Sequence, residues 1–192
     1  VHLKHTGGND IIFVWLLPGA GSMTAVLLDV FDQCFNLIRA TKVEDPESLD
    51  MVSIAKNNGN VRVINVETST PSNIENAQQL NLIEHPNLDL IHTANFYEGC
   101  WLFTNTHRGR FVTFLRHPME RMVALYNDMN FGEEMQVSLL QFLRETNSED
   151  NRMVRYLTNV KSGPLGQNHV DMAAEILSRK ALVLLTDFDE IS

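Results

Sequence analysis

Apolar runs that alternate with amphipathic stretches constrain the fold of this chain more than any other feature. The predicted strands cover residues 11–17, 61–66, 88–91, 110–115 and 181–185. The predicted helices cover residues 23–38, 71–80, 96–103, 118–130, 150–157 and 168–179. A further helix is expected to begin at Ser138, which forms a capping box with Gln141, and Asn168 is expected to cap the helix over residues 168–179. Near-continuous apolar strands are typical of a parallel sheet covered by helices on both faces. We therefore expect an α/β fold in three layers, with a central, mainly parallel sheet.

The length of 192 residues indicates a single domain over residues 1–192. The chain has no initiating Met and stops directly after a strand-like run, so we expect it to be truncated at both ends. The longest apolar run, Ile11 to Leu17, is far shorter than the about 20 residues that span a bilayer. A membrane anchor would therefore lie outside the given chain. The polar segment 41–60 predicts a solvated acidic loop that ends in a turn.

The formal net charge of -9 argues against general binding to nucleic acid or to anionic membranes, although one local anion site remains compatible with it. Two cysteines, Cys34 and Cys100, are too few for a disulfide scaffold or a cysteine zinc site. They could pair, or both could be buried thiols. Cys34 falls in an apolar helical stretch, which favours a small core residue. The histidines show no metal-binding spacing.

The turn between the first strand and the first helix is rich in small residues. Its candidate binding residues are Gly19, Ala20, Gly21, Ser22, Met23 and Thr24. Consecutive N–H groups at a helix N-terminus favour a phosphate, and glycines allow the backbone to approach it closely. The nucleotide-binding pattern G-x-x-x-x-G-K-[ST] is absent. An ordinary tight turn is the simpler interpretation of this segment alone.

A second candidate anion site follows the fourth predicted strand. This strand ends at Arg116, and Pro118 opens a helix, so the guanidinium emerges where parallel sheets bind ligands. Arginine supplies a planar fork of donors that suits phosphate. A structural salt bridge is the alternative for Arg116. For Arg121, in the first turn of the helix, we prefer a solvated position.

The stretch from Arg116 to Tyr126 reads R-H-P-M-E-R-M-V-A-L-Y. It resembles the 3′-phosphate-binding segment of the membrane-associated carbohydrate sulfotransferases, the class of the heparan and chondroitin enzymes, whose pattern is R-[DH]-P-x-x-R-x-x-S-x-Y. The small-residue turn is similar to the 5′-phosphosulfate loop of that family, P-K-x-[GA]-[ST]-[ST]. Asn151 to Leu157, with Arg155, resembles a helix that follows in many members. The resemblance covers roughly residues 11–191 and identifies the chain as a divergent member or a fragment.

The resemblance implies a P-loop-like, sulfotransferase-like fold and the donor 3′-phosphoadenosine 5′-phosphosulfate (PAPS), without a metal. The sulfuryl group would pass to a hydroxyl or an amine, with a carbohydrate as the expected acceptor. The donor site would comprise the Gly19 to Thr24 segment, Arg116, Arg155 and the position of Ala124. Resemblance alone implies a Golgi location behind a membrane anchor, and no nucleic acid partner is expected.

Two positions depart from the family pattern. Gly19 replaces the loop lysine, and loss of such a donor typically costs on the order of a hundredfold in rate. Ala124 replaces the serine that contacts the 3′-phosphate. Lys4, Lys42 and Lys56 are the possible substitutes for the lysine. A relative that binds nucleotide or glycan without turnover is therefore the alternative function. A kinase-like phosphoryl-transfer domain is a third, which the missing lysine disfavours.

The candidate bases for the acceptor are His92 and Glu67. His92 ends the third predicted strand, and a histidine with an ordinary pKa suits general-base work. Glu67 follows the second predicted strand. A satisfied structural side chain is the alternative at both positions.

Overall fold

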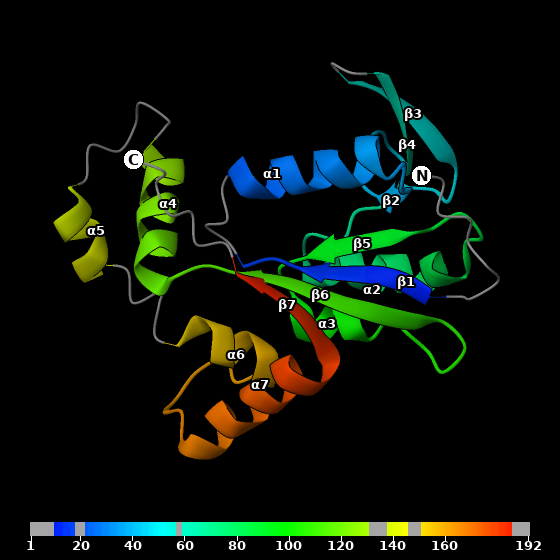
Figure 1. Cartoon of the computed structure of the whole chain (residues 1–192). Helices are drawn as coiled ribbons and strands as arrows, with labels where there is room; N and C mark the ends of the chain where they lie inside the picture. Colours follow the sequence, from blue (N-terminus) through cyan, green and yellow to red (C-terminus); the bar gives the residue numbers. More distant parts are fainter. Residues whose placement is uncertain (1–9, 18–21, 57–58, 131–137, 146–150, 186–192) are drawn as a thin grey trace. The chain divides into compact units, whose positions relative to one another are not determined.

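The apolar runs form the strands of one sheet, which Figure 1 shows in the computed structural model. The structure describes residues 10–17, 22–56, 59–130, 138–145 and 151–185. The chain divides into two compact units: unit 1 comprises Val1–Trp15 and Ala25–Val112, and unit 2 comprises Leu16–Thr24 and Thr113–Ser192. In the described residues, no helix combines the length and the apolar character that crossing a membrane requires.

The strand order in the sheet is β3-β4-β2-β5-β1-β6-β7. The strands are β1 (Asp10–Trp15), β2 (Arg39–Ala40), β3 (Met51–Lys56), β4 (Gly59–Ile64), β5 (Leu90–Thr93), β6 (Arg108–Leu115) and β7 (Ala181–Leu185). β1 pairs with β5, and β2 pairs with β4 and β5, all in parallel. β3 runs antiparallel to β4. The predicted α/β class with a mostly parallel sheet is thus confirmed.

An aromatic core covers one face of the sheet in unit 1. Phe13 and Trp15 share this face because alternate residues of a strand point the same way. Their ring centroids lie 5.6 to 6.3 Å from those of Phe96, which opens α3 (Phe96–Cys100), and of Phe111 on β6, and the Phe96 and Phe111 centroids are 4.8 Å apart. α2 (Pro71–Gln79) lies beside α3. Its predicted start is confirmed, since Thr70 accepts a hydrogen bond from the Asn73 N–H at 3.2 Å.

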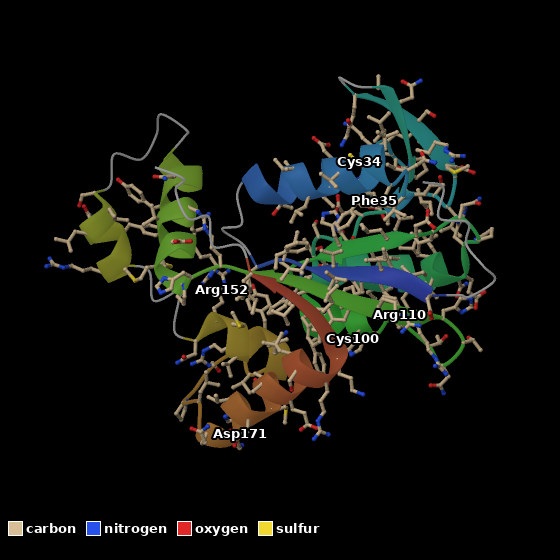
Figure 2. All side chains as sticks on the ribbon, viewed as in Figure 1. Cys34, Phe35, Cys100, Arg110, Arg152 and Asp171 are labelled. Carbon is tan, nitrogen blue, oxygen red and sulfur yellow. The ribbon has the colours of Figure 1, made fainter. Side chains whose placement is uncertain are left out.

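The opposite face is covered by the end of α1 (Ser22–Asp29) and by η1 (Val30–Cys34), a π-helical turn in which the Phe35 N–H donates to the Val30 carbonyl. The predicted helix to residue 38 is therefore too long. Asn36 ends it, because its φ of 52° is left-handed, a conformation that asparagine tolerates. Cys34 is a free, exposed thiol beside an exposed Phe35 (Figure 2). Its prediction as a core residue is wrong.

β3 occupies residues 51–56 of the segment that we predicted to be a loop, and it forms a β-hairpin with β4, which overlaps the strand predicted over residues 61–66. β3 and β4 pair from Met51↔Ile64 to Lys56↔Gly59. Exposed and half-buried residues alternate along β3, so the strand carries no apolar run that would reveal it. Asn65 organises the preceding loop: its Oδ1 accepts from the backbone of Val43 and Glu44, and its Nδ2 donates to the carbonyls of Glu44 and Pro46. Such a buried amide needs these partners because unpaired polar atoms are costly.

Unit 2 contains α4 (Pro118–Asn130), α5 (Leu139–Glu145), α6 (Arg152–Thr158) and α7 (Gln167–Lys180), followed directly by β7 (Figure 1). The bounds of α4 and β7 agree with the prediction. The Ser138 side chain accepts from the Gln141 N–H at 3.2 Å and opens α5 as expected. Asn168 does not cap α7. Gly166 precedes that helix, and its N–H donates to Nδ1 of His169 at 2.9 Å, so the histidine supplies the cap.

Candidate functional site

The Gly-rich turn is only partly within the described residues. Gly19, Ala20 and Gly21 lie outside them. Ser22 and Met23 open α1, and Thr24 is half-buried in its first turn. The segment Leu16–Thr24 belongs to unit 2, the unit that also contains the residues after β6.

Arg116 lies in the short corner between β6 and α4, as the sequence predicts. Its Nε–H donates to Oε2 of Glu120 at 3.2 Å, an i,i+4 ion pair in which the arginine side chain is 28% exposed. The salt bridge that we considered as an alternative therefore exists. It uses one edge of the guanidinium, and no described residue bonds to the two terminal amino groups. These groups can still grip a phosphate oxygen pair.

His117 caps α4, a role that the sequence analysis did not assign. Its Nδ1 accepts from the Met119 N–H at 3.3 Å, and its carbonyl accepts from the Arg121 N–H at 3.0 Å. Pro118 has no N–H to offer. Few backbone donors are thus left at this helix start, so Arg116 would carry most of any anion binding here. A histidine directly before a proline-initiated helix is the signal that could have suggested the cap.

Arg121 is buried, and the prediction of a solvated position is wrong. Its residue is 8% exposed, and burial lowers the pKa of its guanidinium, with a further lowering from Arg152. Arg152, labelled in Figure 2, lies on α6 with its guanidinium 5.6 Å from the centre of the Tyr156 ring. The two arginines of α4 and α6 therefore lie within electrostatic range of each other in unit 2.

Two further predicted ligands have other surroundings than expected. Arg155 on α6 donates to the carbonyls of Val160 and Gly163, at 3.3 and 2.9 Å, so it holds the loop that follows its own helix. A phosphate would have to compete with those bonds. Ala124 is half-buried on α4 and offers only a methyl group where the family serine has a hydroxyl.

The two candidate bases lie in the same corner of unit 1, where β4 and β5 end. Thr68 donates its hydroxyl to the His92 carbonyl at 2.9 Å. Oε1 of the neighbouring Glu67 accepts from the N–H groups of Thr68 and Ser69, both at 3.1 Å. Glu67 therefore closes the turn that leads into α2, a structural use of one carboxylate oxygen. The predicted phosphate ligands Arg116, Ala124 and Arg155 belong to the other unit, unit 2.

His92 is a poor general base in this structure. Its pKa is lowered to about 4, first by burial and then by the Arg39 guanidinium, against the opposing effects of Glu67 and Asp32. Such a ring is neutral near pH 7 but accepts a proton weakly. Its buried Nδ1 has no hydrogen-bond partner among the described residues, so the ring is not a fully satisfied structural side chain either.

A buried charge network, which the sequence analysis missed, lies on the face that carries His92. The Asp32 side chain is fully buried on η1. Both of its carboxylate oxygens lie 3.1 Å from the Arg39 Nε and accept its N–H. Lys56 lies 3.1 Å from Asp32 and also pairs with Asp29. Lys42 pairs with Asp45 at 2.6 Å. Lys42 and Lys56, two possible substitutes for the missing loop lysine, are thus engaged inside unit 1, and Lys4 lies outside the described residues.

No group of three or more histidine, cysteine or carboxylate side chains in the described part of the chain is placed to hold a metal ion. Comparison of the chain with protein-family models, with curated proteins and with solved structures found no match. The functional assignment therefore depends on the residues themselves and on the motif resemblance.

Proposed function

We propose that this chain is a sulfotransferase-type domain that binds PAPS and transfers its sulfuryl group to a hydroxyl or amine of an acceptor, with a carbohydrate as the acceptor class. The observation that carries the proposal is the corner between β6 and α4. There Arg116 follows the strand directly and is partly buried, and its terminal amino groups, beside a helix start, have no partner among the described residues. This is the chemistry that a nucleotide 3′-phosphate requires.

The residues have distinct roles in this proposal. Arg116 grips the 3′-phosphate, and Glu120 orients its guanidinium through the ion pair. The Gly19 to Thr24 segment holds the 5′-phosphosulfate. PAPS supplies the activated sulfuryl group and leaves as adenosine 3′,5′-bisphosphate, and the proton of the acceptor hydroxyl or amine passes to solvent. Neither His92, with its low pKa, nor Glu67, with an oxygen bound to two amides, is well suited to remove that proton.

A second candidate function is nucleotide or glycan binding without turnover. Gly19 lacks the amine that would assist the departing nucleotide, and Ala124 lacks a 3′-phosphate donor. The low pKa of His92 adds a third reason, since the best-placed candidate base is weak near pH 7. The two functions share the donor site and differ only in chemistry.

Calorimetric titration with adenosine 3′,5′-bisphosphate tests the shared donor site. We expect the folded protein to bind it, and Arg116→Ala to weaken binding by about 1.5 kcal/mol or more, the scale of a charged hydrogen bond and about tenfold in affinity. Arg108→Ala is the matched control, because Arg108 is exposed at the opposite end of β6. Absence of binding by the folded wild type, or an equal loss in both variants, would refute the site.

Transfer of labelled sulfate from PAPS to a panel of glycans separates the two functions. Turnover by the wild type excludes the binding-only alternative. If the wild type binds the bisphosphate but is inactive, Gly19→Lys provides the follow-up, because it restores the amine that the loop lacks.

A further inference from the structure

Helix α3 and its C-cap residue carry two aromatic side chains on the solvent side: Tyr97 lies in the helix and Trp101 follows it. Its core side is already filled: Phe96 and Leu102 are buried, and a Cβ added at Gly99 would lie 2.7 Å from the Phe13 ring. Tyr97 and Trp101, four residues apart, project from the other side and are 40% and 55% exposed. The two rings lie next to each other rather than singly, and contiguous exposed apolar groups are typical of interaction surfaces.

The two rings form a fixed corner. Their centroids are 5.7 Å apart and their planes meet at 74°. The Trp101 backbone is held on both sides, since its N–H donates to the Glu98 carbonyl and its own carbonyl accepts from Nε2 of Gln78 on α2. A ring on an anchored backbone loses little conformational entropy when a ligand binds.

The surrounding sequence has amides and carboxylates but no cations. Residues 63–107 contain no Lys and no Arg. The exposed side chains on and next to α2 include Glu75, Gln78, Gln79 and Asn81. This stretch of sequence has carboxylates and no basic side chains, a composition that disfavours a polyanionic ligand. It offers amide donors and acceptors that match uncharged hydroxyl groups.

We infer that Tyr97, Trp101 and Gln78 form a binding surface for a neutral saccharide. An aromatic face packs against the C–H side of a sugar ring, while amides pair with the hydroxyls at its rim, and neither contact needs a charge. The surface would hold a saccharide whether or not the chain transfers a sulfuryl group. The inference therefore goes beyond the proposed function and selects unsulfated, uncharged sugar chains over polyanionic ones.

Tryptophan fluorescence provides a selective assay because the chain has two tryptophans and Trp15 is 0% exposed. The probes are neutral oligosaccharides of N-acetylglucosamine, galactose and glucose, with a heavily sulfated oligosaccharide and choline for comparison. We expect at least one neutral oligosaccharide to protect Trp101 from acrylamide quenching. Binding of that sugar, measured by calorimetry, should weaken about fivefold or more in Tyr97→Ala and in Trp101→Ala. Phe35→Ala, which removes a similarly exposed ring directly after η1, should leave binding within about twofold of the wild type.

The inference is overturned if no neutral oligosaccharide changes the quenching at millimolar concentration. Protection by choline or by the sulfated sugar alone would also overturn it, as would unchanged affinity in Trp101→Ala. Titration of the same variants with adenosine 3′,5′-bisphosphate keeps the two proposals apart. Loss of saccharide binding with normal nucleotide binding supports this surface and leaves the donor site untouched, and an inactive donor site leaves the saccharide result standing.

Discussion

The ring of His92, whose Nδ1 is buried without a partner among the described residues, should make the stability of this protein fall on mild acidification. The pKa of His92 is lowered from 6.5 to about 4 in the folded state, chiefly by burial. Protonation therefore favours the unfolded chain. The stability contribution of the neutral ring is complete above about pH 6.5 and is lost as the pH falls toward 4. The free energy of unfolding falls by about 3 kcal/mol in all, and about 2 kcal/mol of this has been lost when the pH reaches about 5.

The assay is urea unfolding of the wild type and of His92→Gln at about pH 7.5 and about pH 5. Carboxylates also titrate in this range, so the informative quantity is the difference between the two proteins. The wild type should lose about 2 kcal/mol more than His92→Gln between these two conditions. His107→Gln, in a surface loop where the ring bonds Thr106, controls for removal of a histidine. Equal pH dependence in the wild type and His92→Gln would refute the reasoning.

Two further predictions test the packing of unit 1. Asp32→Asn should lower the free energy of unfolding by about 3–5 kcal/mol, because Arg39 stays buried without its carboxylate and Lys56 keeps only Asp29, whereas Asp29→Asn at the half-exposed end should cost about 1 kcal/mol or less. If Asp32→Asn and Asp29→Asn lowered the free energy of urea unfolding by similar amounts, Asp32 would not be the buried centre of the charge network. Gly99→Ala should cost about 1–3 kcal/mol, since the new Cβ would lie 2.7 Å from the Phe13 ring, and Cys100→Ser at the exposed neighbour is its control. A thermal midpoint unchanged by Gly99→Ala would show that α3 does not pack tightly on the sheet.

Local signals predicted much of the order of elements. Proline at the first helical position predicted the starts of α2 and α4, and the uninterrupted apolar run predicted β7. The corner with Arg116 followed from the same rules, because a strand end and a helix start are both visible within a few residues. These features depend on neighbours in the chain, so tertiary structure only had to accommodate them.

Side-chain environments were not predictable in the same way. Arg121 was expected in solvent and is buried, whereas Cys34 was expected in the core and is exposed. Arg155 bonds two carbonyls of its own loop, contacts that the sequence did not indicate. In each case the outcome depends on which face of a helix meets another element, and residue type alone does not decide that.

The sequence by itself determined most of the succession of strands and helices (β2 and β3 are the exceptions), the α/β class and the strand-to-helix corner at Arg116, because hydrophobic periodicity and capping act over a few residues. Tertiary structure alone decided that β3 pairs with β4, that Asp32 meets Arg39 and Lys56 beneath η1, and that His92 has a pKa of about 4. Strand pairing, burial and electrostatic fields depend on groups distant in sequence, and only the folded chain brings these groups together.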